Sequence, residues 1–237
     1  TVTLTTGTTN TGTTTNNSTI NVNGGVYGQV TTNGTAGTIN VAGGTYSGKI
    51  TNNNILNIKG GTVSGGFQNN AGKTVNFTKG NVITTTSTNS GYLNISGTNT
   101  TIFTAALTNA SAGTVNQTGG TFAGGITNQA GGYYKITAGT TFITGAVNNA
   151  GRFDITNGTI RGTITNTNAF NQSGGSVTAV NTTAGTYTLS AGIVGGTVTL
   201  GNGTTGTFSQ TGGTVAGAIT TKAKSNYTIN NVNARIT

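Results

Sequence analysis

Side chains able to carry out acid–base, nucleophilic or metal chemistry are almost absent from this chain. Its 237 residues include one acidic residue, Asp154, and neither histidine nor cysteine. Glycoside hydrolysis needs two cooperating carboxyl groups, and serine or cysteine nucleophiles usually need a histidine base. Zinc sites are built from cysteine, histidine and carboxylate ligands. We therefore expect no catalytic residue, no metal site, no cofactor and no enzymatic activity.

Positive charge is the strongest electrostatic signal. Ten Lys and Arg residues against one acid give a formal net charge of +9, which attracts polyanions. The cations fall at several phases of the repeat described below and form no single stripe, so we expect no specific nucleic-acid binding. Lys135 and Asp154 occupy the same phase one repeat apart. This predicts an ion pair between them, worth roughly 0.2–1 kcal/mol.

A short recurring pattern must position these groups. An apolar residue, a polar residue and a second apolar residue or glutamine are followed closely by glycine, at spacings of 17 to 22 residues. The mean of about 19 suits one coil of a β-solenoid. Side chains alternate across a strand, so the first member of each triplet points inward. Thirteen residues form this first column: Val2, Ile20, Ile39, Leu56, Val75, Leu93, Val115, Tyr134, Phe153, Phe170, Tyr187, Phe208 and Tyr227.

Other inward positions follow from the same alternation. The first column is aromatic from Tyr134 onward, which predicts rings stacked at about 4.8 Å along the axis. The second column begins at Leu4 and ends at Ile229, and it includes three glutamines whose amides should bond backbone groups at the adjoining turn. Two further strands in each coil are expected to bury apolar residues, among them Val26, Val30 and Phe142.

The residue between the two inward columns points outward and is asparagine in six successive repeats. We expect these amides to form a ladder of side-chain hydrogen bonds, as in cross-β assemblies. Threonine lies two residues before several of them, so an ice-binding face is a lower-ranked alternative function. The ladder comprises Asn21, Asn40, Asn57, Asn76, Asn94 and Asn116.

Together these patterns predict an all-β fold, a single-stranded parallel β-helix (β-solenoid) of about 13 coils of about 19 residues. Each coil should contain three short strands, and the irregular spacing favours a right-handed winding. We see no linker and expect one β-solenoid domain over residues 1–237. Glycine interrupts every apolar stretch, so no membrane span is predicted.

Three segments carry the clearest form of the repeat: VNQTGGTF at 115–122, FNQSGGSV at 170–177 and FSQTGGTV at 208–215. In this style the chain resembles the Gly/Asn/Thr-rich β-helical regions of secreted bacterial surface proteins, namely autotransporter passengers and filamentous-haemagglutinin-type adhesins. The resemblance covers nearly the whole chain and implies export to the cell surface. This chain is more basic than is common for such passengers.

The leading functional hypothesis is a secreted structural protein, a subunit or segment of an extracellular filament. Open solenoid ends expose unpaired strands, so we expect head-to-tail self-assembly, a homopolymer joined through Val2 and Leu4 at one end and Tyr227 and Ile229 at the other. A surface adhesin that binds anionic glycans or cell surfaces is the alternative. Because the chain starts at Thr1 and contains no Met, we expect a processed form or an excised piece.

Overall fold

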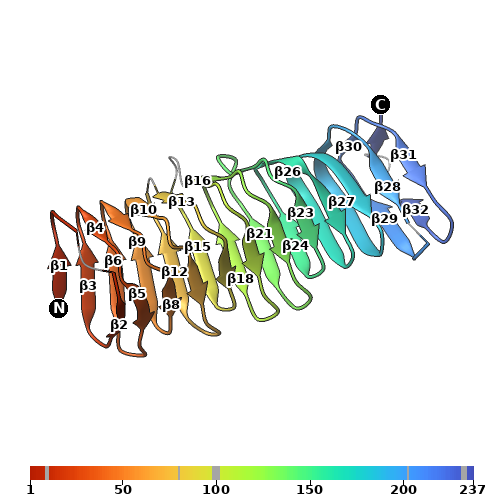
Figure 1. Cartoon of the computed structure of the whole chain (residues 1–237). Helices are drawn as coiled ribbons and strands as arrows, with labels where there is room; N and C mark the ends of the chain where they lie inside the picture. Colours follow the sequence, from red (N-terminus) through yellow and green to blue (C-terminus); the bar gives the residue numbers. More distant parts are fainter. Residues whose placement is uncertain (9–10, 80, 98–101, 202, 231–233) are drawn as a thin grey trace.

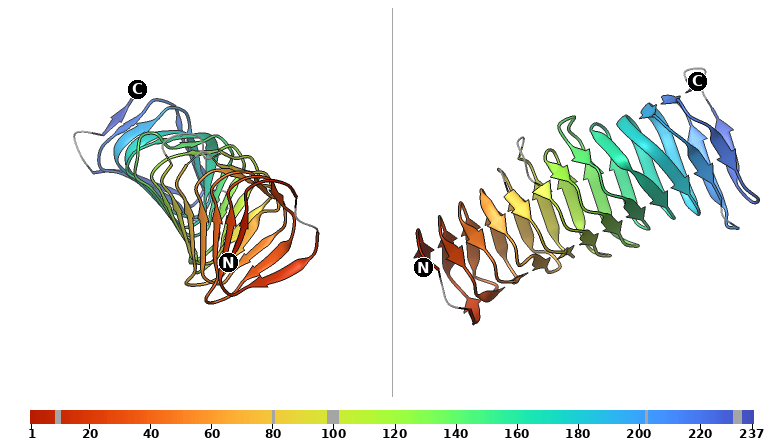
Figure 2. Two further views of the ribbon diagram at one scale, coloured as in Figure 1. Left: turned by 90° about the vertical axis from the view of Figure 1, so that its left-hand side faces the viewer. Right: turned by 45° about the horizontal axis from the view of Figure 1, so that its top comes forward.

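The chain winds into a parallel β-solenoid of about 12 turns of about 19 residues, without helices in the part described. The computed structural model describes residues 1–8, 11–79, 81–97, 102–201, 203–230 and 234–237. Successive turns stack along one axis and give an elongated rod (Figure 1), about 60 Å long at the usual ~4.8 Å strand spacing. The end-on view in Figure 2 shows windings of similar outline following one another. The predicted parallel β-helix is confirmed.

Each winding contributes to three parallel ladders, which we call faces 1, 2 and 3. Face 1 carries the predicted triplets, and its first and second columns point inward. It consists of β1 (Val2–Leu4), β3 (Thr19–Val22), β6 (Thr38–Val41), β9 (Ile55–Ile58), β12 (Thr74–Phe77), β15 (Tyr92–Ile95), β18 (Thr114–Gln117), β21 (Tyr133–Ile136), β24 (Arg152–Ile155), β29 (Gly206–Gln210), β32 (Asn226–Ile229) and the first parts of β26 (Ala169–Thr182) and β27 (Gly185–Val194).

Face 2 is made of very short strands. They are β4 (Val26–Tyr27), β7 (Thr45–Tyr46), β10 (Gly61–Val63), β13 (Asn81–Ile83), β16 (Ile102–Phe103), β19 (Thr121–Phe122), β22 (Phe142–Ile143), β30 (Thr214–Val215), β33 (Arg235–Ile236), the start of β25 (Thr159–Asn166) and later parts of β26 and β27.

Face 3 completes each winding. It contains β2 (Thr13–Asn16), β5 (Val30–Asn33), β8 (Ile50–Asn52), β11 (Phe67–Asn69), β14 (Ser87–Asn89), β17 (Leu107–Asn109), β20 (Ile126–Asn128), β23 (Val147–Asn149), β28 (Val198–Leu200), β31 (Ile219–Thr221) and the ends of β25 and β26.

The first column of face 1 stacks in register through all of its thirteen members. Val2 pairs with Ile20, and the pairing continues one winding at a time as far as Phe208 and Tyr227. The eleven members between the two end residues are all buried. Val2 is 52% exposed, and Tyr227 is partly buried. Equivalent residues of successive windings therefore lie directly over one another.

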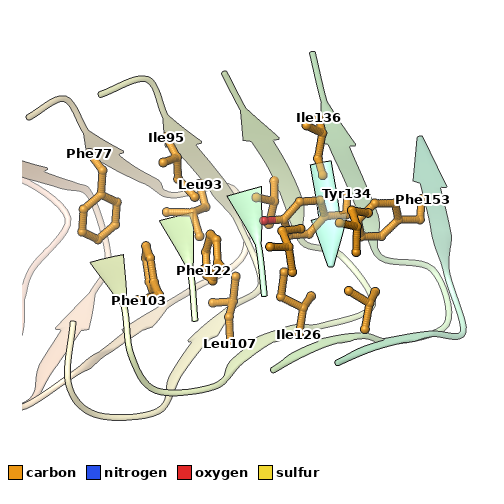
Figure 3. Close-up of a cluster of buried hydrophobic side chains, with 14 of the residues drawn as sticks. Phe77, Leu93, Ile95, Phe103, Leu107, Phe122, Ile126, Tyr134, Ile136 and Phe153 are labelled. Carbon is orange, nitrogen blue, oxygen red and sulfur yellow. The ribbon is translucent and has the colours of Figure 1, made fainter. Parts of the chain in front are cut away.

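Aromatic rings form an unbroken series of contacts along the core from Phe67 to Tyr227. Figure 3 shows aromatic side chains such as Phe103, Phe122 and Tyr134 packed among aliphatic ones in the core. Tyr134 and Phe153 stack with centroids 4.8 Å apart and an interplanar angle of 2°. The predicted stacking is confirmed at four of the five steps from Tyr134 to Tyr227. Phe153 and Phe170 instead meet edge to face at 5.9 Å.

Three residues expected inside lie on the outer side. In these short strands the inward position is one residue later than the alternation predicts. Val30 is 46% exposed, and its neighbour Thr31 is buried. The inward hydroxyl of Thr31 is accommodated because it accepts a hydrogen bond from Tyr46. Phe142 is half-buried under the Arg161 guanidinium, whose carbon lies 5.4 Å from the ring centroid. Val26 likewise points outward, while Tyr27 is buried.

Glycines are required at corners where the backbones of adjacent windings approach closely. Gly120 has φ of +77°, a left-handed conformation that other residues rarely adopt. At Gly145 a Cβ atom would lie 2.1 Å from the carbonyl oxygen of Gly124 in the preceding winding. The repeated glycines thus let the windings stack at the spacing of a β-sheet.

Candidate functional site

The outward asparagines of face 1 form a continuous row of hydrogen bonds. Each Nδ2 donates to the Oδ1 of the equivalent asparagine one winding earlier, from Asn40 to Asn21 and onward to Asn116 and Asn94. The donor–acceptor distances are 2.8 to 3.2 Å. These side chains are half-buried. We call this set, Asn21 to Asn116, the outer amide row.

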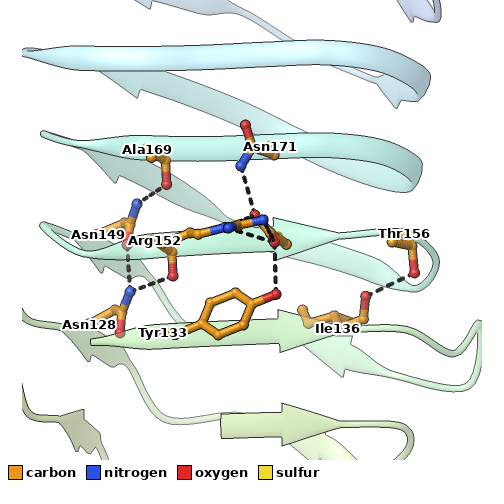
Figure 4. A network of polar contacts seen from close by, with 9 residues as sticks. Asn128, Tyr133, Ile136, Asn149, Arg152, Thr156, Ala169 and Asn171 are labelled. Carbon is orange, nitrogen blue, oxygen red and sulfur yellow. Dashed lines mark hydrogen bonds and ion pairs between the residues drawn. The ribbon is translucent and has the colours of Figure 1, made fainter. Parts of the chain in front are cut away.

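Asp154 lies beyond the end of the outer amide row and is held by hydrogen bonds from three residues. The Arg152 guanidinium donates from Nη2 at 2.7 Å and from Nε at 3.0 Å to Oδ2, the Tyr133 hydroxyl donates to Oδ2 at 2.8 Å, and Asn171 donates to Oδ1 at 2.7 Å (Figure 4). The Arg152 guanidinium carbon also lies 5.0 Å from the Tyr133 ring centroid. This cluster ties three successive windings together.

The predicted ion pair between Lys135 and Asp154 is wrong. The two residues are in register on adjacent strands, but in the part of the chain that the structure describes the salt bridge of Asp154 is with Arg152. Arg152 lies two residues away on the same side of the same strand. Its planar guanidinium meets the carboxylate with two nitrogens, which a lysine ammonium cannot do.

The titration of this cluster follows from its contacts. Burial of the Asp154 carboxyl raises its pKa, but the hydrogen bonds from Arg152, Asn171 and Tyr133 and the charge of Arg152 outweigh it and hold the pKa below the ordinary value. Burial raises the pKa of the Tyr133 phenol, and its bond to the Asp154 carboxylate raises it further. Asp154 is therefore an ionised structural partner at neutral pH.

A second row of asparagines, on the inner side of face 3, was not predicted. From Asn16 to Asn149, each Nδ2 donates to the Oδ1 of the asparagine in the next winding at 2.7 to 2.9 Å, and all the side chains are buried. Most also donate to carbonyl groups of the corner, as Asn128 does to Gly132 and Arg152. We call this set the inner amide row: Asn16, Asn33, Asn52, Asn69, Asn89, Asn109, Asn128, Asn149 and Asn166.

The three inward glutamines of face 1 each pair with a tyrosine of the following winding. The tyrosine hydroxyl donates to the glutamine Oε1 in the pairs Gln117–Tyr134, Gln172–Tyr187 and Gln210–Tyr227, at 2.6 to 2.7 Å. Each glutamine Nε2 also donates to a carbonyl at its own corner, which confirms that expectation. Burial raises the pKa of Tyr134 and Tyr187. Their phenols are therefore neutral donors.

The outer side of face 3 presents a regular column of short polar residues. Threonine occupies nine of its twelve positions, and the in-register column runs Thr15, Thr32, Thr51, Gln68, Thr88, Thr108, Thr127, Asn148, Thr165, Asn181, Thr199 and Thr220. A shallow cavity of about 360 Å³ lies between this column and the adjoining corner, lined by residues that include Thr127, Gln129, Asn148 and Thr167.

The two end windings leave apolar side chains uncovered in this structure. At one end Val2 is 52% exposed, and Leu4 is partly buried against the core. At the other end Ile229 and Ile236 are each 50% exposed, and Tyr227 packs partly against the core. These edges carry the residues expected to mediate assembly.

Comparison of the chain with family models, with curated proteins and with solved structures gave no match. What the structure supports is a β-helical repeat with stacked asparagine and threonine columns. Among the described residues, no group of three or more His, Cys, Asp or Glu side chains could hold a metal ion. The described part of the chain also has no helix of the length and apolarity needed to span a bilayer.

Proposed function

We propose that this chain is a rigid segment of an extracellular fibre, in which further windings continue the solenoid at its ends. The observation that carries the proposal is the unbroken register of the first column, which extends to the uncovered edges of β1 and β32. The resemblance of the repeat to autotransporter passengers and filamentous-haemagglutinin-type adhesins supports a location at the cell surface. The added windings belong either to the same polypeptide or to a second copy.

The two edges are compatible with one another. β32 ends in Tyr227, Thr228 and Ile229, and β1 reads Val2, Thr3 and Leu4, so both edges alternate apolar, polar and apolar side chains. Placed in register, a second copy would cover the exposed apolar residues at both edges and pair the free strand edge. Head-to-tail stacking would therefore extend each ladder without a change of pattern.

Sedimentation and negative-stain microscopy over a range of concentrations test this proposal. We expect rods whose lengths are multiples of one subunit and increase with concentration. Replacing Ile229 with lysine should block stacking, because it places a charge on the joining surface. The matched control Ile193→Lys changes a side chain that is 51% exposed on the side of the rod, on face 2, and should leave stacking intact. Rods of single-subunit length at high concentration would contradict head-to-tail assembly.

A second candidate, the ordering of water at an ice surface, is favoured by the threonine column on the outer side of face 3. Its residues repeat at the strand spacing of about 4.8 Å and offer a methyl and a hydroxyl group in each position. A thermal-hysteresis measurement decides this candidate. No hysteresis at millimolar protein removes it, and hysteresis that is lost in Thr108→Tyr supports it.

A further inference from the structure

The outer side of face 1 between β9 and β24 has exposed apolar groups in a row, and we call this area the central face. Tyr92 is 51% exposed, and its in-register neighbours along the axis are Thr74 and Thr114, which are much shorter. Tyr133 lies in the same column two windings further along, about 10 Å away at the strand spacing. Ile55, which is 38% exposed, lies two windings in the opposite direction.

The outer amide row runs beside this column and has unused hydrogen-bonding capacity. A side-chain amide has two N–H donors and two acceptor lone pairs. The structure gives Asn57, Asn76 and Asn94 one donated and one accepted bond each within the row. Each amide therefore keeps a donor and an acceptor for a ligand, repeated at every winding.

Cations surround the same area. Lys59 and Lys79 are exposed beside it, and Lys135 is half-buried within it. The Arg152 side chain is 60% exposed, and Asp154, the single acid, is already bonded to Arg152, Tyr133 and Asn171. No Lys or Arg precedes Lys49 in the sequence, so the first windings carry no comparable charge. The central face therefore has a local excess of positive charge.

We propose that the central face binds an extended acidic polysaccharide that lies parallel to the rod axis. Aromatic rings stack on the C–H faces of sugar rings, and the exposed Tyr92 ring is the main platform. Tyr133, whose ring has the Arg152 guanidinium on one face, lies at a distance from Tyr92 comparable with a disaccharide unit and can offer only its other face. The outer amide row supplies donors and acceptors for sugar hydroxyl groups. Lys59, Lys79 and Lys135 attract the carboxylates or sulfates of the chain, which makes the binding sensitive to salt, while the charge of Arg152 is already paired with Asp154.

Single-stranded nucleic acid also binds to aromatic rings and cations, but its bases stack on closely placed platforms. Here the aromatic side chains are two windings apart, and the groups between them are hydrogen-bonding amides and a threonine. This arrangement favours a chain of sugar rings with many hydroxyl groups. The inference concerns the side of the rod and does not depend on assembly at its ends.

Binding of single rods to immobilised polygalacturonate tests this site, with the fully methyl-esterified polymer as the uncharged control. We expect binding to polygalacturonate that weakens as salt rises, and much weaker binding to the ester. Tyr92→Leu should weaken binding about fivefold, and Tyr92→Phe should retain it because the ring remains. The double variant Lys59→Gln/Lys135→Gln should weaken binding about tenfold and reduce the salt dependence.

The matched control is Lys49→Gln/Lys222→Gln, which removes the same charge from exposed positions beside face 3. It should change the affinity less than twofold. Equal losses in the two double variants would show that net charge alone is responsible and would overturn the site. Equal binding to the acidic and esterified polymers would also overturn it. Tighter binding to poly(dT), lost in Tyr92→Leu, would assign the central face to nucleic acid instead.

Discussion

The inner and outer amide rows use the same side chain in two different environments. In the inner row the donors point toward the next winding, and in the outer row they point toward the previous one. Asn109 in the inner row is buried and donates to Asn128, Gly113 and Tyr133. Asn76 in the outer row donates to Asn57 alone and is half-buried.

This difference decides how much each row contributes to stability. A buried amide that loses its partner costs about 1–3 kcal/mol for each unsatisfied group, because water cannot replace the bond. A half-exposed amide exchanges its partner for water at small cost. The inner row therefore holds the corners and the core together, while the outer row leaves its remaining bonding capacity available at the surface.

The largest effect should come from an isosteric charge placed in each row. Asn109→Asp turns a donor into an acceptor that faces the Asn128 Oδ1 and two carbonyl oxygens, and it buries a carboxylate. We expect a loss of at least about 4 kcal/mol in the free energy of unfolding, or failure to fold. Asn76→Asp should cost less than about 1 kcal/mol. Urea denaturation of both variants measures the difference.

Similar losses in the two variants would show that burial does not separate the rows. The pH dependence sharpens the test, because a buried carboxyl group at position 109 has a raised pKa in the folded state. The unfolded chain then releases its proton at lower pH than the folded one, so the penalty grows as the pH rises above the ordinary carboxyl pKa of about 4. Asn109→Asp, if it folds, should be least impaired in acid.

A smaller effect is expected at a Gln–Tyr pair on the inner side of face 1. Tyr187→Phe leaves the Gln172 Oε1 unpaired, and we expect a loss of about 1–2 kcal/mol. The chain itself offers the apolar alternative, since Phe153 follows Ile136 and Phe208 follows Leu189 in the same two columns. Gln172→Leu/Tyr187→Phe should therefore cost less than the sum of the single variants. A double-mutant cycle with no coupling would contradict the pairing.

The smallest effect is expected at Asp154, at the outer surface. The lowered pKa of Asp154 means that its stabilisation is complete above the ordinary carboxyl pKa and is lost as the pH falls through the lower folded value. We expect a loss of about 1 kcal/mol or less between pH 6 and pH 2. Thermal melts should show Asp154→Asn less stable at pH 6 and equal to the parent at pH 2. A difference that persists at pH 2 would assign the effect to something other than ionisation.

Much of the architecture could be predicted because the first column repeats a strong signal. A large apolar residue in every winding leaves one consistent inward phase, and the register from Val2 to Tyr227 follows from it. The prediction of Val30 and Phe142 as inward residues is wrong because the short strands of faces 2 and 3 offer few residues in which alternation can be detected. Which residue points inward in these strands depends on tertiary contacts. Examples are the hydrogen bond from Tyr46 to Thr31 and the Arg161 guanidinium over the Phe142 ring.

The asparagines of the inner amide row are visible in the sequence, but their pattern also fits another structure. Asparagine recurs at the end of the third strand in nine successive windings, from Asn16 to Asn166, with the spacing of the repeat. Asparagine is also common in turns, so the same residues indicate a corner. Only stacking of the windings shows that each amide is satisfied by its neighbours and can be buried. Cross-strand register alone favours Lys135 as the partner of Asp154, whereas the structure pairs Asp154 with Arg152, its neighbour two residues back along the same strand.

The Gln–Tyr pairs help neighbouring windings to pair in the correct order during folding. Windings that resemble one another so closely could dock one step out of place, with most apolar contacts preserved. In an intermediate whose windings are paired one step out of register, Gln172 would lie against Phe208 instead of Tyr187. Its buried side-chain oxygen would then have no hydrogen-bond donor. Gln117, Gln172 and Gln210 occur at irregular intervals along the rod. Only the correct pairing of windings therefore gives each of their side-chain oxygens a tyrosine donor.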